Sequence, residues 1–247
     1  MKENIRVYVN DKLQKSKITL NRKQSHYLKN VMRVSLNDRI CVFNEVDGEW
    51  TGVIRLLKKN CCEILIDSFT RSSDSFYDVW LLFAPVKQAR LDYLAQKSCE
   101  MGVKKLWPIF TEYTQVKNIN IDRIRSNLIE AAEQCGLTSI PSIADSKKFV
   151  HILNDWDNIF DDRSVIFCDE RSSTKVFEAL NTEKNKEQKK WAIVIGPEGG
   201  FSDSERSIIK EKNNSIGISL GPRVLRSDTA VVAALAAFQM IIGDWNN

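Results

Sequence analysis

Several classes of protein are excluded by what this 247-residue sequence lacks. No stretch approaches the roughly 18 consecutive apolar residues that suggest a membrane span, and the polar N-terminus has no apolar core of a secretory signal. With 43% apolar and 28% charged residues, the composition is neither collagen-like, disordered nor of low complexity. We therefore expect a globular cytoplasmic protein of one large domain or two smaller ones.

Metal and disulfide chemistry also find little support. The six cysteines are scattered without a C-x-x-C pair, and only two histidines could complete a zinc site. We interpret the cysteines as reduced, mostly buried small hydrophobes, with a reactive thiol as the alternative, and we expect no metal.

Positive charge is concentrated near the N-terminus. Residues 1–75 carry 14 basic and 9 acidic side chains, whereas the remainder carries 22 and 23. A basic module beside a nearly neutral one is typical of a polyanion-docking domain attached to a working domain. A lysine-rich solvated surface is the simpler alternative.

The first part of the chain favours short strands. Residues 22–33 have helical spacing and several basic side chains, the Asp47-Gly48 pair indicates a hairpin turn, and the Ser-rich segment 70–75 is the best domain boundary. Many short strands with little helix indicate a small barrel. Strands are predicted at 5–9, 39–43, 50–57 and 61–69.

The pattern then changes to alternating strands and helices, which favours an α/β domain with a mostly parallel sheet. Strands are predicted at 78–86, 104–110, 164–170, 191–196 and 215–221. Helices are predicted at 87–101, 121–135, 201–212 and 227–245, and a solvated loop at 181–190. The buried face of the 121–135 helix is expected to consist of Ile121, Ile124, Leu128, Ala132 and Cys135.

Two glycine-rich turns follow predicted strands near the C-terminus. In IGPEGGFSDSE (195–205) a buried strand enters a turn, and Ser202 with Glu205 forms the capping box of a helix. Such glycines let the backbone approach a ligand closely. The turn is neither a P-loop nor G-x-G-x-x-G, which disfavours a nucleoside triphosphate or a dinucleotide. A tight structural turn is the alternative.

The second turn is LGPRVLRSDTA (220–230), in which Ser227 or Asp228 is the expected helix cap. Turns at the carboxyl ends of two parallel strands should face one crevice. The helix that follows, TAVVAALAAFQMII, is apolar on almost every side and too short for a bilayer. It should therefore be enclosed by protein.

GPEGGFSDSE followed by LGPRVLRSDTA resembles the C-terminal motifs of the SPOUT methyltransferases, specifically the RsmE-type uridine-N3 methyltransferases of small-subunit ribosomal RNA. The resemblance covers the whole chain. HYLKNVMR (26–33) and DGEW (47–50) are similar to the PUA-like N-terminal domain of that family. QKSCEMGV (96–103), PIFTEYT (108–114) and EAAEQCG (130–136) are similar to its middle motifs.

This resemblance implies a trefoil-knotted α/β domain over residues 74–247, preceded by an RNA-docking, PUA-like β-barrel domain over residues 1–70. A knot is a rare exception to ordinary chain topology. The resemblance also implies a homodimer that binds S-adenosylmethionine in the knot, largely through backbone groups. The implied cofactor-binding residues are Phe83, Ala84, Ile195, Gly196, Pro197, Glu198, Gly199, Gly200, Leu220, Gly221, Val224 and Leu225.

The implied reaction methylates N3 of a specific uridine in the 16S RNA of the small ribosomal subunit. Because neutral uracil carries a proton on N3, the enzyme needs a base, or a cation that stabilises the uracil anion. Arg226 is the candidate cation or phosphate holder, with a salt bridge as its alternative role. Asp228 is the candidate base or a helix cap, and Glu198 is a base, a ligand-orienting group or a loop brace.

Candidate RNA contacts lie mainly in the basic N-terminal helix, with solvated or packed side chains as the alternative. Two departures from the family pattern concern RNA or active-site contacts: Tyr113 and Leu137 stand where many members carry arginine. The candidate RNA-binding residues are Arg22, Lys23, His26, Lys29, Arg33 and Arg223.

Two other functions remain open. One is another SPOUT reaction, on a tRNA base or ribose, against which the barrel-like module argues. The other is a non-catalytic RNA-binding protein of ribosome assembly, against which the intact glycine turns argue. A Rossmann-type methyltransferase is set aside because no glycine fingerprint follows the early strands.

Overall fold

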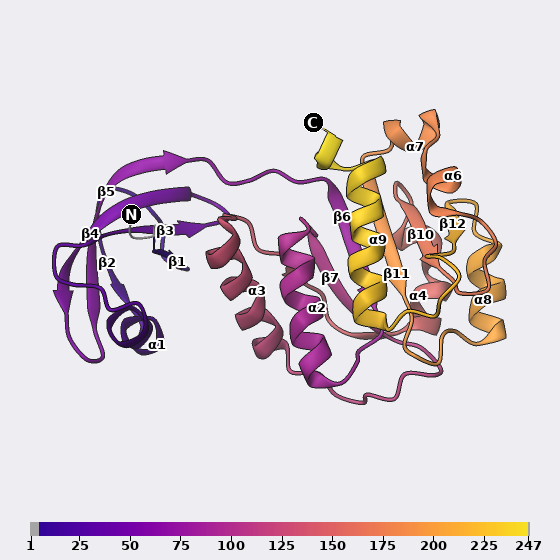
Figure 1. Ribbon diagram of the computed structural model, residues 1–247, viewed down its shortest axis with the longest axis horizontal. Coiled ribbons are helices and arrows are strands. Elements are labelled where there is room, and N and C mark those ends of the chain that lie inside the picture. The colour runs from indigo at the N-terminus through magenta and orange to yellow at the C-terminus, as the bar shows by residue number, and fades with distance from the viewer. Residues whose placement is uncertain (1–4, 247) are drawn as a thin grey trace. The chain divides into compact units, whose positions relative to one another are not determined.

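The computed structural model describes residues 5–246, which divide into two compact units. The first unit contains the described residues up to Ser75 together with Ile129–Ile140. The second contains Phe76–Leu128 and the chain from Pro141 onward. Figure 1 shows both units and labels the elements for which there is room.

A curled five-stranded sheet forms the first unit, in the order β1-β3-β4-β5-β2. All its strand pairs are antiparallel except β1 with β3. Because β1 and β2 are edge strands that do not pair with each other, the curled sheet is a half-barrel. The elements are β1 Arg6–Tyr8, β2 Lys17–Leu20, α1 Arg22–His26, a π-helix Tyr27–Val31, β3 Arg39–Asn44, β4 Gly48–Leu57 and β5 Cys62–Arg71. The predicted strands are confirmed, and β2 is an additional one.

The second unit carries a sheet in which every described pair is parallel, in the order β12-β10-β11-β6-β7-β8, with β9 also pairing with β7. Its strands are β6 Asp78–Phe83, β7 Lys105–Phe110, β8 Ser142–Ile143, β9 Lys147–Lys148, β10 Ser164–Cys168, β11 Lys190–Ile195 and β12 Ser215–Ile218. The mostly parallel α/β architecture is thus confirmed.

Helices cover both faces of this sheet, as expected for continuously apolar strands. The helices are α2 Gln88–Glu100, α3 Ile121–Cys135 (which enters the first unit at Ile129), α4 Phe149–Asn154, α5 Trp156–Ile159, α6 Val176–Leu180, α7 Glu183–Glu187, α8 Asp203–Lys210, α9 Ser227–Ile241 and the 3-10 turn Asp244–Asn246. None of the described helices has the length and apolar character needed to cross a membrane.

Alternate residues of the central strands point to opposite faces. Val194 of β11 packs in a core with α4, α5 and α8, in which Phe201 contacts Phe149 and Phe167 at ring-centroid distances of 5.5 and 4.9 Å. On the other face Trp191 meets Phe238 of α9 at 5.9 Å. Helices α2 and α9 lie side by side across that face (Figure 1).

Three local expectations were wrong. Ile121 and Cys135 of the α3 face are exposed, because they lie in the terminal turns, while Ile124, Leu128 and Ala132 are buried. Residues 183–187 form the short helix α7 rather than a loop, since the Thr182 side chain caps the amide of Asn185.

Helix α9 is only half enclosed within one chain. Val231, Leu235 and Phe238 are buried, whereas Met240 is 56% exposed and the four residues Val232, Ala233, Ala236 and Ala237 are partly exposed. The complete enclosure expected from its apolar sequence is therefore not provided by the described residues alone.

Candidate functional site

A cleft of about 270 Å³ opens at the carboxyl ends of β10, β11 and β12, the usual ligand edge of an open parallel sheet. Most of the predicted cofactor residues line it: Ile195, Gly196, Pro197, Glu198, Gly199, Gly200, Leu220, Gly221, Val224 and Leu225. Phe83 and Ala84 do not line it but are buried, with the Ala84 amide donating to the Ile195 carbonyl at 3.0 Å.

The first wall is the turn after β11, where two glycines leave no room for a side chain. A Cβ at Gly196 would lie 2.7 Å from the buried Phe201 ring. Gly200 has φ +68°, and its Cβ would meet Arg206 at 2.8 Å and Glu170 at 2.9 Å. The predicted capping box of Ser202 and Glu205 then begins α8. Both positions of this wall therefore favour glycine.

The second wall follows β12 and leads into α9. Gly221 has φ +110°, which favours glycine, and Val224 is 84% exposed. Ser227 Oγ donates to the Gly196 carbonyl at 2.9 Å, which ties the two turns together. The expected capping by Ser227 or Asp228 was wrong: Arg226 is the N-cap, and its side chain makes no capping bond.

Asp228 holds an atom that ordinary packing does not explain. Its Oδ1 is buried and finds no hydrogen-bond partner among the described residues. It lies in the first turn of α9, where a helix favours negative charge, between the cleft-lining residues Ser227 and Ala230. A buried acceptor without a partner is costly, and such atoms often mark a ligand or reaction site.

An arginine-centred cluster supports the cleft from behind. Arg206 of α8 is 4% exposed and donates through Nε to the Phe201 carbonyl at 3.0 Å. It pairs with Glu170 at 2.5 Å and also with Asp169, which Lys210 meets at 2.9 Å. Burial lowers the pKa of the Arg206 guanidinium. The cluster joins the end of β10 to the glycine turn.

Glu198 projects from the glycine turn toward α2. Its carboxylate accepts a hydrogen bond from Arg90 Nη1 at 2.5 Å, and both side chains are partly exposed. This contact fixes the turn from the side of α2, which fits the loop-brace alternative for Glu198.

Comparisons with known proteins decide the family. The chain matches a model of the RNA methyltransferase domain over residues 73–239 and one of the RNA methyltransferase PUA domain over 20–67. It is 32% identical to "Ribosomal RNA small subunit methyltransferase E" of Buchnera aphidicola subsp. Acyrthosiphon pisum, over 97% of this chain and 94% of that one. The chain belongs to the ribosomal RNA small subunit methyltransferase E family. The resemblance found in the sequence is confirmed.

Two solved structures are similar along nearly the whole chain. A Legionella pneumophila methyltransferase in complex with SAM is 28% identical, with a TM-score of 0.84, covering 98% of this chain and 99% of that one. The family E enzyme of Neisseria gonorrhoeae bound to S-adenosyl methionine is 24% identical, covers 98% and 100%, and supports the fold alone with a TM-score of 0.87.

Of the predicted catalytic and RNA-binding residues not yet placed, Arg223 is exposed and lines the cleft. The others are not among the residues that line it. Arg226 is exposed at the start of α9 and does not line the cleft. Leu137 is in the first unit, where its carbonyl accepts from Arg6 at 2.9 Å. The five predicted RNA contacts in α1 and the segment after it are all exposed: Arg22, Lys23, His26, Lys29 and Arg33.

Several cleft and supporting residues were not predicted. Cys168, Asp169 and Glu170 line the cleft at the end of β10, where the acidic pair after a buried strand was an available signal. Desolvation raises the pKa of the Cys168 thiol to about 12, which disfavours the thiolate at neutral pH. Arg206 and Arg90 carried no local signal, because their partners are 36 and 108 residues away in sequence.

Proposed function

We propose that this protein transfers a methyl group from S-adenosylmethionine to N3 of a uridine in 16S ribosomal RNA, within the small subunit. The observation that carries the proposal is the cleft lined by the two glycine turns, in a chain of this family. We assign methyl transfer to residues 74–247 and RNA docking to residues 1–70.

The cleft residues fit a sulfonium nucleoside. Four glycines line the cleft, and glycine lets backbone groups approach a ligand closely. Apolar side chains of Ile195, Leu220 and Leu225 complete the lining. When bound, S-adenosylmethionine would supply an electrophilic methyl group, its S–methyl bond breaking to give the neutral thioether as the N3–methyl bond forms.

Asp228 is the proposed base. Its unpartnered Oδ1 would accept the N3 proton, leaving the nitrogen lone pair free for the methyl group. Arg226, exposed two residues before Asp228, would stabilise the developing negative charge on uracil O2 or O4, or hold the adjacent phosphate. Glu198, braced by Arg90, would orient the turn, and Arg223 would contact a phosphate at the mouth of the cleft.

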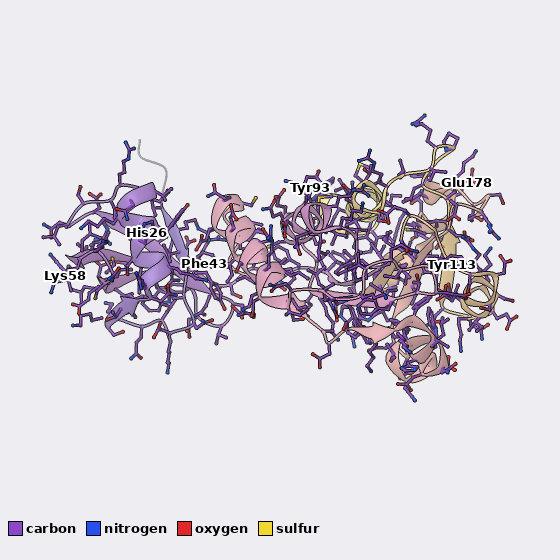
Figure 2. The ribbon with its side chains drawn as sticks, turned by 90° about the horizontal axis from the view of Figure 1, so that it is seen from below. His26, Phe43, Lys58, Tyr93, Tyr113 and Glu178 are labelled. Atoms are coloured by element: carbon purple, nitrogen blue, oxygen red, sulfur yellow. The ribbon has the colours of Figure 1, made fainter. Side chains whose placement is uncertain are left out.

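The first unit offers a basic surface for RNA. Residues 22–33 contain no acidic side chain, and Lys23, Lys29 and Arg33 are exposed there. His26, also exposed, is labelled on this helix in Figure 2. Lysine and arginine contacts to phosphates supply sequence-independent affinity that weakens as salt rises.

The homodimer and the trefoil knot that the family resemblance implies are also part of this proposal. Part of the α9 surface is apolar and partly exposed, with Met240 at 56%, which supports a homodimer that covers it. Threading of α9 beneath the glycine turn, to which Ser227 is bonded, would complete the trefoil knot. We place the enzyme in the cytoplasm, where its ribosomal substrate is assembled.

The direct test is transfer of labelled methyl groups to small-subunit particles from a strain that lacks the modification, followed by nucleoside analysis. Label in 3-methyluridine is the expected result. Label in another nucleoside, or activity only on tRNA, would overturn the uridine-N3 assignment. Failure to bind S-adenosylmethionine in equilibrium dialysis would overturn the enzymatic function and favour an assembly protein.

A further inference from the structure

Tyr113 is an exposed aromatic residue in a turn that the structure holds firmly. The turn follows β7, and its ends are joined because the Thr111 amide donates to Thr114 Oγ1 at 2.9 Å and the Thr114 amide donates to the Thr111 carbonyl at 3.2 Å. In between, the Glu112 amide donates to Glu205 Oε1 at 3.0 Å. An exposed ring is therefore presented by an ordered backbone.

One carboxylate connects this turn to the wall of the cleft. While Glu205 Oε1 accepts from Glu112, its Oε2 accepts from the Ser202 amide at 2.9 Å. Glu205 is 7% exposed, so these bonds are shielded from water. The helix cap of α8 thus also fixes the position of Tyr113 relative to the glycine turn.

The Tyr113 side chain packs against the rim of the cleft. A Cβ built at Gly199 would lie 3.1 Å from Tyr113 Cβ and 3.7 Å from its Cγ, and Gly199 lines the cleft. Tyr113 itself is 42% exposed and is not among the residues that line the cleft. The ring is backed by the glycine turn and remains accessible from outside, which suits a second ligand at the mouth rather than the cofactor inside.

The target uracil of the proposed reaction is such a ligand. N3 lies on the Watson–Crick edge of uracil, so the target base must be unpaired before it can react. A base that is taken out of the stack to reach an enzyme's site loses its stacking neighbours, and an aromatic side chain replaces them in many single-strand binding sites. Building on the proposed function, we propose that Tyr113 is the stacking platform that holds the target uracil at the mouth of the cleft.

The test compares Tyr113→Phe, which keeps a ring, with Tyr113→Leu, which removes it. Tyr93→Leu is the matched control, because Tyr93 is 43% exposed in the same unit, on α2. Figure 2 labels both tyrosines at separate positions. Steady-state methylation of small-subunit particles, S-adenosylmethionine binding by calorimetry and thermal unfolding are measured for each variant.

Tyr113→Leu should lower kcat/KM for particles about tenfold, within the range for loss of one base–aromatic stack. Cofactor affinity and melting temperature should not change, and Tyr113→Phe and Tyr93→Leu should match wild type. Equal kcat/KM for Tyr113→Leu and wild type would overturn the stacking role. So would a parallel loss in Tyr113→Phe, or a loss that follows weaker cofactor binding or a lower melting temperature.

Photo-crosslinking gives a readout independent of turnover. Particles reconstituted with 4-thiouridine-substituted RNA should crosslink to the peptide that contains Tyr113, and the crosslink should disappear in Tyr113→Leu. A crosslink confined to other peptides would overturn the proposal. If wild-type protein methylates no uridine at all, the proposed function fails first, which distinguishes that failure from a failure of Tyr113 alone.

Discussion

Replacing Gly196 by alanine should damage the cleft without touching any catalytic group. The added Cβ would lie 2.7 Å from Cε2 of Phe201 and 3.1 Å from two further ring atoms. The ring cannot move aside easily, because it is 1% exposed and packs against Phe149 and Phe167. The conflict must therefore displace the glycine turn or the core.

Overpacking of this kind costs about 1–3 kcal/mol. For a domain of this size, that corresponds to a fall in melting temperature of roughly 2–12 °C. Displacement of the turn should also weaken S-adenosylmethionine binding at least tenfold, which is about 1.4 kcal/mol. Scanning calorimetry measures the first effect and isothermal titration the second.

Two other glycines provide matched controls for Gly196→Ala. At Gly217 an added Cβ meets nothing within 4 Å, and φ is not positive, so Gly217→Ala should be neutral or slightly stabilising. At Gly221 the space is also open, but φ is +110°, so Gly221→Ala should cost about 1–3 kcal/mol through backbone strain alone. If Gly196→Ala behaved like Gly217→Ala in both assays, the steric reasoning would be refuted.

Three further predictions concern charged side chains. Arg206→Met should destabilise by about 3–5 kcal/mol in chemical denaturation, since it leaves the buried Asp169 carboxylate underpaired; Arg171→Met, which breaks an exposed pair, should cost about 1 kcal/mol or less. Asp228→Asn should lower kcat about 10²- to 10⁴-fold with unchanged cofactor affinity. Replacing Lys29 together with Arg33 by glutamine should reduce the slope of log affinity for RNA against log salt by about 0.7–0.9 per lost phosphate contact.

Each of these predictions has a contradicting outcome. If Arg206→Met and Arg171→Met had similar free energies of unfolding, the buried cluster around Arg206 would not stabilise the cleft. Retained turnover in Asp228→Asn would exclude Asp228 as the base, and Asp203→Asn, at an exposed position of α8, is its control. A salt slope that falls equally when the exposed pair Lys58 and Lys59 is replaced would show that the basic helix has no special role.

Local sequence signals account for the parts of the fold that could be predicted. The bounds of α3 match the expected 121–135, because Gly136 follows its end with φ +77°. The capping box at Ser202 likewise marks the start of α8. In contrast, α7 was missed because its polar sequence has no apolar stripe, and it depends on one capping threonine and the buried Asn185.

The glycine turns of the site could be predicted for the same reason, since each is one contiguous segment. The supporting contacts could not, because they join distant segments: Arg90 meets Glu198, and Glu205 holds the turn that carries Tyr113. The unpartnered Oδ1 of Asp228 is likewise a property of packing, which no sequence pattern reveals. The N-cap of α9 was misplaced because Ser227 uses its hydroxyl for Gly196 instead.

Reverse transcription of treated ribosomal RNA tests the central claim most directly. A methyl group on N3 blocks the Watson–Crick edge, so the transcriptase should stop at every modified uridine. Small-subunit particles that lack the modification, incubated with this protein and S-adenosylmethionine, should acquire one new stop, at one uridine of the 16S RNA, and Asp228→Asn should not produce it. No new stop, or stops at other bases, would contradict the assignment of this cleft to uridine-N3 methylation.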